Sequence, residues 1–308
     1  MRAALIIFTL LLLLTSAPPV TAKTSSKPFA AWPLPNGEFA YLTPHDETKI
    51  RVIDGRGKWQ GSYIEETGKG GILMPWDMVA SPDGYLFVLD RMKAKVNVYD
   101  YDFKYQYSIG EKGTGYGQLK SPQALAIDAR GFLYVANNGN NRIEKFNIEG
   151  EHKGYLEPYS GEGVGTEFKY ITAMVVSPQG ELYVAVDSED PSVLRNVYIY
   201  NANGDLSTTI KVMKWGGSGC FVDLFLNEDN TLLIVDSPSS SGGFAGAVWR
   251  TDSDGTLLGK YEPYDSDFDR FYSPVEVIVT EGKMFIFCAE HKCLVYNAGG
   301  GFIYSFGL

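Results

Sequence analysis

Three acidic residues occur in segments that otherwise have the composition of buried β-strands. They are Asp77 in WDMVASP, Asp223 in VDLFLNE and Glu276 in VEVIVTE. Like charges brought together raise one another's pKa unless a cation neutralises them. Carboxylate oxygens are ligands that Ca²⁺ and Mg²⁺ prefer. If the fold brings the three together, they predict a divalent-metal site; the alternative is that each carboxylate caps nearby backbone N–H groups or contacts water.

The elements that position these residues follow from a repeat. Glycine-rich runs such as GTGYG at 113–117 recur before alternating strands. A phosphate-binding loop would occur once and open a helix, so we interpret the runs as repeat boundaries. Equivalent markers lie 47 to 53 residues apart, which indicates a solenoid or a propeller. The markers are Pro28, Pro75, Pro122, Ile171, Phe221 and, approximately, Pro274.

Each repeat contains four short strand patterns. An inner strand and a turn precede an aromatic, β-branched strand such as FLYVAN, then a third such as RIEKFN, and a more polar fourth strand closes the unit. No segment has helical periodicity. We therefore predict an all-β fold, a six-bladed β-propeller of four-stranded antiparallel blades over residues 23–308. The three carboxylates each lie two residues after a marker, so we expect them to occupy equivalent positions that face one central channel.

The third repeat carries a family resemblance. Its pattern G-x-G-x-G-x-L-x-x-P, followed by LAIDARG and FLYVANNGNNRIEKF, resembles the NHL repeat, the unit of a class of six-bladed β-propellers. The resemblance implies a binding module, a scaffold or, as in some relatives, a lyase or lactonase. It also implies a structural role for Arg142. The fifth repeat departs from the pattern, with Asn230 where the turn glycine is expected.

The first and last repeats determine how the ring closes. Residues 29–37 align as an inner strand and turn, and the chain ends on the fourth strand of its own last repeat, so we expect no strand exchange at the seam. A two-residue turn at Glu290 and His291 would place Cys288 opposite Cys293. Their Cα atoms would be about 4.5 Å apart, which a disulfide accepts. We predict this disulfide; the alternative is two reduced thiols packed between sheets, and Cys220 is left as a small buried residue.

Aromatic residues concentrate in the loops that enter the inner strands, which share one face of a propeller with the loops between second and third strands. Such rims bind peptides, sugars or cationic groups, although tyrosines also pack between blades. Among the aromatic residues, we expect Trp76 and Trp215 to be the most exposed at the surface. The predicted ligand-binding residues are Trp76, Asp77, Tyr116, Gln123, Trp215, Asp223 and Glu276.

The N-terminus and the charge limit the partners. Residues 1–22 have a positive start, an apolar run and small residues at the end, which predicts a signal peptide and export to the periplasm or beyond. No later segment is long and apolar enough to span a membrane. The formal charge of −10 becomes 26 − 37 = −11 without residues 1–22. This net negative charge excludes nucleic acid as a partner and favours a cationic ligand or a metal ion.

The sequence leaves three functions open. We favour a module that binds a peptide, glycan or protein partner on the channel face. The alternative is a divalent-metal-dependent hydrolase or lyase with Ca²⁺ or Mg²⁺ on the three carboxylates; a third possibility is a structural subunit of a cell-envelope assembly. His45, His152 and His291 offer at most two converging ligands, too few for a zinc site.

Overall fold

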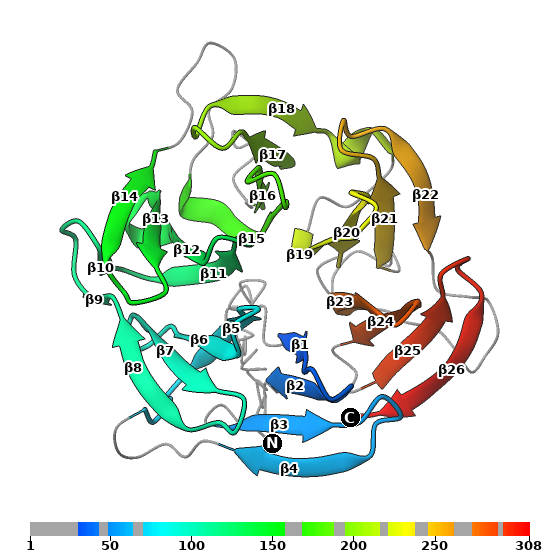
Figure 1. Cartoon of the computed structure of the whole chain (residues 1–308). Coiled ribbons are helices and arrows are strands. Elements are labelled where there is room, and N and C mark those ends of the chain that lie inside the picture. The colour runs from blue at the N-terminus through cyan, green and yellow to red at the C-terminus, as the bar shows by residue number, and fades with distance from the viewer. Residues whose placement is uncertain are drawn as a thin grey trace, which may run out of the picture.

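The computed structural model confirms the predicted fold: six four-stranded antiparallel sheets surround a central axis (Figure 1). It describes residues 30–42, 49–63, 70–157, 168–187, 195–215, 221–237, 246–261, 273–288 and 292–308. The predicted signal peptide, His45, Cys220 and His291 lie outside these ranges. Within them the only helical elements are three short 3₁₀ turns, and none is long and apolar enough to cross a membrane.

Each blade is one uninterrupted stretch of chain, with its strands paired in sequence order. Blades 1 to 3 contain β1 (Ala31–Pro33), β2 (Phe39–Leu42), β3 (Ile50–Ile53), β4 (Trp59–Tyr63), β5 (Pro75–Ala80), β6 (Tyr85–Asp90), β7 (Lys95–Asp100), β8 (Tyr105–Ile109), β11 (Pro122–Ile127), β12 (Phe132–Asn137), β13 (Arg142–Asn147) and β14 (His152–Leu156). Blades 4 to 6 contain β15 (Ile171–Val176), β16 (Leu182–Val186), β17 (Asn196–Tyr200), β18 (Leu206–Ile210), β19 (Phe221–Leu226), β20 (Leu232–Asp236), β21 (Ala247–Thr251), β22 (Leu257–Tyr261), β23 (Pro274–Thr280), β24 (Lys283–Cys288), β25 (Lys292–Asn297) and β26 (Phe302–Gly307). A two-stranded parallel pair, β9 (Glu111–Lys112) and β10 (Gln118–Leu119), brackets the glycine run before blade 3.

The sequence markers coincide with the first residues of five inner strands, β5, β11, β15, β19 and β23. Each of these strands also has a β-bulge directly after its first residue, for example between Pro75 and Asp77. A bulge increases local twist and re-aims the next side chain. The repeat therefore fixes both where each inner strand begins and where the following side chain points.

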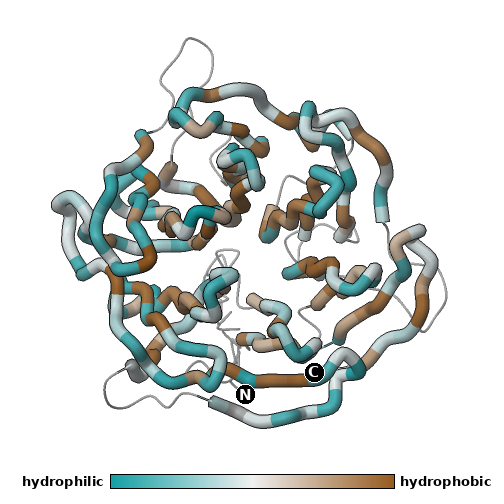
Figure 2. Tube along the Cα trace, viewed as in Figure 1, coloured by the Kyte–Doolittle hydropathy of each residue, from teal (hydrophilic) through white to brown (hydrophobic). Residues whose placement is uncertain are grey.

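The core lies between neighbouring blades. Side chains from blade 2, such as Phe87 and Val98, pack in one cluster with Leu133 and Val135 of blade 3. Second and third strands are buried on both faces, because every blade is covered by two neighbours; all five residues of β16 are buried. Figure 2 shows the apolar residues gathered on the inner parts of the blades, with polar residues more frequent toward the outside.

A repeated contact joins each blade to the next. The outer strand runs around the circumference (Figure 1), and a residue near its end lies against a residue of positive φ in the turn between the third and fourth strands of the next blade. The pairs are Tyr63–Phe103, Ile109–Gly150, Leu156–Gly204, Ile210–Gly255, Tyr261–Gly300 and Phe306–Gly57. The last pair joins blade 6 to blade 1, so the ring closes without strand exchange, as predicted. Beside it, the Tyr304 hydroxyl donates to the Gly55 carbonyl at 2.7 Å.

The predicted disulfide is wrong. Cys288 pairs with Lys292, and Cys293 pairs with Phe287. The connection between β24 and β25 therefore has three residues instead of the predicted two. A shift of register by one residue turns a side chain to the other face of the sheet. Cys288 and Cys293 accordingly lie in different core clusters as buried free thiols. This is the reduced alternative considered above.

Candidate functional site

A cavity of about 310 Å³ lies on the propeller axis, lined by the inner strands of all six blades. Asp77, Asp223 and Glu276 all line it, as their repeat positions predict. The lining comprises mainly the third to sixth residues of the inner strands, so the carboxylates lie at the end nearer the entering loops. The remaining wall is largely apolar and includes Met78 and Met174.

Two of the carboxylates hold neighbouring inner strands together. Oδ2 of Asp77 accepts a hydrogen bond from the Leu125 amide of blade 3 at 2.8 Å, and its Oδ1 accepts from its own neighbour, Met78, at 2.9 Å. Oδ2 of Asp223 accepts in the same way from the Val277 amide of blade 6 at 3.1 Å. Both side chains are 6 % exposed, and amide donors are what a buried carboxylate requires.

Backbone capping therefore accounts for Asp77 and Asp223, the alternative that the sequence left open. No group of three or more His, Cys, Asp or Glu side chains is close enough to hold a metal ion anywhere in the described ranges. The structure brings the three predicted ligands to one cavity, but it does not bring them to one ion. What the cavity offers instead is negative charge above apolar walls, and none of the described residues that line it is a lysine or an arginine.

The two predicted tryptophans do not form an exposed rim. Trp76 is only 7 % exposed and packs between blades 2 and 3, with the Arg91 guanidinium 4.2 Å from its ring centroid. Trp215 is half-buried, 6.0 Å from the Trp249 ring. Gln123 is half-buried as the second residue of β11 and is not among the residues lining the cavity. These residues contribute mainly to packing, the alternative stated for the aromatic residues as a group.

Tyr116 is the one predicted aromatic residue that is well exposed, at 71 %. Its ring stacks on Tyr155 with centroids 5.2 Å apart, and the Arg142 guanidinium lies within 5.6 Å of both rings. Hydrogen bonding to Tyr116 raises the pKa of Tyr155. Sequence reasoning missed Tyr155 as the partner of Tyr116, because the two lie in different segments of the repeat.

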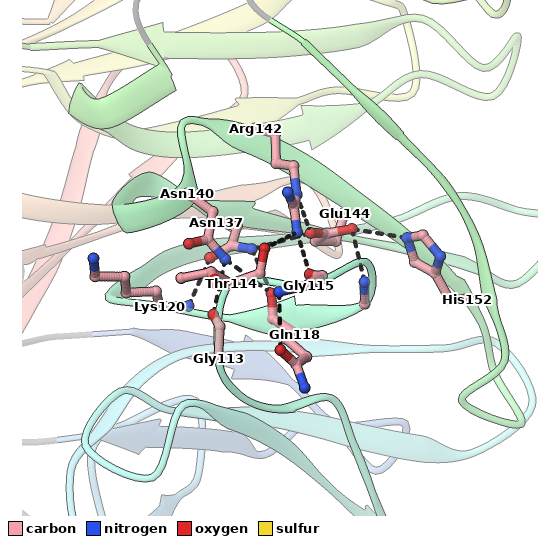
Figure 3. A network of polar contacts seen from close by, with 11 residues as sticks. Gly113, Thr114, Gly115, Gln118, Lys120, Asn137, Asn140, Arg142, Glu144 and His152 are labelled. Atoms are coloured by element: carbon pink, nitrogen blue, oxygen red, sulfur yellow. Dashed lines mark hydrogen bonds and ion pairs between the residues drawn. The ribbon is translucent and has the colours of Figure 1, made fainter.

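A polar network orders the glycine run that contains Tyr116 (Figure 3). Arg142 donates to the carbonyls of Thr114 and Gly115, and it pairs with the fully buried Glu144. Glu144 also contacts the His152 ring at 2.8 Å and accepts a hydrogen bond from the side-chain amide of Asn137 at 3.1 Å. The run thus presents carbonyls to an arginine and does not form a phosphate cradle. Arg142 has the structural role that the resemblance implied.

A second cavity, of about 640 Å³, lies where blade 6 meets blade 1, among the turns that join first to second strands. Phe39, Phe285 and Tyr304 contribute apolar wall, and Arg56 and Glu281 are among its charged residues. Nothing in the sequence marked it, because it arises from the junction of the first and last repeats.

The ring of six four-stranded blades makes the protein a six-bladed β-propeller. The NHL repeat family matches residues 119–146, from β10 through most of β13. The matched repeat and the six-bladed ring together support an NHL-repeat β-propeller family, a fold that is compatible with a binding or interaction module.

Solved structures agree on the fold. Virginiamycin B lyase from Staphylococcus aureus superposes with a TM-score of 0.61 at 13 % identity, over 93 % of this chain and 86 % of that one. A streptogramin B lyase gives 0.61 at 12 % identity, over 92 % and 83 %. A protein of unknown function from Bacteroides caccae gives 0.60 at 12 %, over 85 % and 90 %. No curated protein matches the chain in sequence. At these identities the similarity shows the fold alone.

Proposed function

We propose that this propeller is a binding module that takes a cationic side chain of a peptide or protein partner into its central cavity. The observation that carries the proposal is the composition of the described part of the cavity wall, where three carboxylates lie among apolar side chains and no basic residue is present. A lysine or arginine side chain matches this wall, because its charged end suits the carboxylates and its methylene stem suits the apolar surface.

The size of the cavity supports one inserted side chain. Small-ligand pockets occupy about 300–1,000 Å³, and this cavity of about 310 Å³ is at the lower limit. The net charge of −10 adds a long-range attraction for cationic partners. We further propose that the protein acts outside the cytoplasm, on the basis of the signal-peptide pattern in residues 1–22.

The test uses short peptides of the form acetyl-Gly-Arg-Gly-amide and the same peptide with citrulline, which keeps the shape of arginine without its charge. Calorimetric titration should show binding of the arginine peptide and at least tenfold weaker binding of the citrulline peptide. Glu276→Gln should weaken arginine binding by a similar factor, since it removes one charge and keeps the shape. Glu151→Gln, on the surface of blade 3, is the matched control.

Equal affinity for the two peptides, or no binding of either, would overturn the proposal. Elemental analysis of the purified protein separates it from the metal-dependent alternative. Bound Ca²⁺ or Mg²⁺ that is lost in Glu276→Gln would favour a hydrolase or lyase on the same three carboxylates.

A further inference from the structure

The outer strands of the six blades share a β-bulge at the same repeat position. In each blade, one residue near the start of the fourth strand has no pairing partner in the third strand. That residue lies on the outer wall, the surface that the fourth strands form around the circumference. These residues are Gln60, Gln106, Lys153, Ser207, Leu258 and Ile303. Four blades therefore place a polar residue at this position, and the adjacent blades 5 and 6 place a large aliphatic one.

The aliphatic residues are exposed. Leu258 is 51 % and Ile303 is 43 % exposed, and the residue before each of them, Leu257 or Phe302, is 38 % exposed. Exposed edge strands are usually protected from unwanted pairing by charged side chains and bulges. In blades 5 and 6 the bulge is present, and an apolar side chain stands where a polar one would be expected.

Charge is also missing from the outer part of blade 6. Residues 297–308, NAGGGFIYSFGL, contain no charged side chain, although 21 % of the chain is charged. The equivalent turn of every other blade contains at least one charge: DGRGK, DYDFK, NIEGE, NANGD and DSDGT. Depletion of charge around exposed aromatic and aliphatic residues is typical of the centre of a protein interface.

The shape of the wall selects the kind of partner. Successive blades are rotated by about a sixth of a turn, so the wall is convex, and a flat membrane or a second convex propeller would touch about one blade at a time. The four side chains cover on the order of a few hundred Å², less than the roughly 800 Å² per partner of a stable protein complex. An extended polypeptide can instead follow the wall from one blade to the next.

We propose that the outer wall of blades 5 and 6 binds an extended, largely apolar segment of a partner protein. β26 is the last strand of its sheet, so its outer edge is available for backbone pairing with such a segment. Alternate apolar side chains of the segment contact Ile303 and Leu258. The surface is distinct from the central cavity, and neither depends on the other.

The experiment uses a displayed library of random twelve-residue peptides, selected on the full chain. The most enriched peptide is synthesised, and its affinity is measured by fluorescence anisotropy. We expect alternating apolar sequences and an affinity that falls at least tenfold in the double variant Leu258→Gln, Ile303→Gln. Glutamine occupies this position in blades 1 and 2, so the variant should fold. Ser207→Gln, the same position in blade 4, should leave the affinity unchanged.

Each other outcome contradicts the proposal. Peptides that bind the double variant equally well, or an absence of enriched peptides, would show that the wall is not a binding surface. A dimer that forms with concentration in sedimentation velocity and disappears in the double variant would assign the wall to a second copy. Binding to neutral phosphatidylcholine vesicles that is lost in the double variant would assign it to a lipid surface. Glu276→Gln should bind the selected peptide normally, which separates this test from that of the central cavity.

Discussion

Blades 3 and 6 share one backbone and differ in the side chains that complete it. At equivalent positions blade 3 has Asn137 and Glu144, which order its entering loop, and blade 6 has Cys288 and Leu294, which are buried in an apolar cluster. Both blades keep the four-strand order, the inner-strand bulge and the outer-strand bulge. The backbone pattern is therefore sufficient for a blade, and the polar network of blade 3, which has a counterpart at Asp90 and Asn97 of blade 2, is an addition.

The difference between blades 3 and 6 helps to distinguish residues that stabilise a blade from residues that form a surface for binding. In blade 3 the charges of Arg142 and Glu144 are paired with each other, and they serve to order the entering loop. In blade 6 the equivalent positions, Cys288 and Leu294, are uncharged, and the outer strand has no charged side chain, so the outer surface is apolar. A departure from the repeat is thus most informative where it leaves side chains exposed, as at Phe302 and Ile303.

The largest expected effect comes from making blade 3 resemble blade 6 at one position. Glu144→Leu would leave the mostly buried Arg142 without its carboxylate, which we expect to cost about 3–5 kcal/mol in the free energy of unfolding. Urea denaturation measures it. Glu151→Gln, which alters an exposed ion pair in the same blade, should leave the free energy of unfolding nearly unchanged. A loss for Glu144→Leu no larger than that for Glu151→Gln would show that the network does not hold the blade.

A smaller effect should follow from changing the junction between blades 6 and 1. Gly57 has φ +80°, and an added Cβ would overlap the Phe306 ring, so Gly57→Ala combines backbone strain with overpacking at about 2–4 kcal/mol. Gly282→Ala isolates the strain alone, since Gly282 has φ +70° and no heavy atom within 4 Å of such a Cβ. It should cost about 1–2 kcal/mol. Equal costs in thermal unfolding would mean that the contact does not contribute.

At alkaline pH we expect blade 3, but not blade 6, to contribute a pH-dependent loss of stability, which is a smaller effect than the two above. Burial, with the nearby Asp128 charge, raises the pKa of Tyr134 in blade 3 to about 12, while blade 6 has Phe285 at the equivalent place. Because the folded-state pKa lies above the unfolded value of about 10, stability is fully present below pH 10 and is lost as pH rises toward 12. Tyr134→Phe should reduce this slope by up to about 1.4 kcal/mol per pH unit, measured as urea midpoints against pH. An unchanged slope in Tyr134→Phe would contradict this assignment.

The smallest expected effect is that of a reductant. Cys288 and Cys293 are free, and burial raises the pKa of the Cys293 thiol, so both should react with Ellman's reagent only after unfolding. Dithiothreitol should leave the melting temperature unchanged. A drop on reduction would show that a cross-link between these residues exists after all.

The sequence predicts the periodic features well. Five markers are the first residues of inner strands, and Asn230 does adopt the positive φ, 61°, of the glycine that it replaces. These features repeat, and each copy supports the interpretation of the others. The three carboxylates reach a common cavity for the same reason.

Features that depend on one residue of register could not be predicted in this way. Alternation of apolar residues cannot distinguish a two-residue from a three-residue connection, and that single residue separates Cys288 from Cys293. The capping role of Asp77 likewise depends on a bulge that shifts its side chain toward Leu125. Contacts between distant segments, such as Tyr116 with Tyr155, leave no local pattern at all.

The contiguity of each blade also has a consequence for how the protein is made. Blades can form one after another as the chain leaves the ribosome, since none waits for a strand from elsewhere. The face of blade 1 that packs against blade 6 has no neighbour until blade 6 forms, when Phe285 reaches Phe39 and Phe306 reaches Gly57. Formation of blade 6 therefore ends the period in which a nascent ring is open to proteases and chaperones.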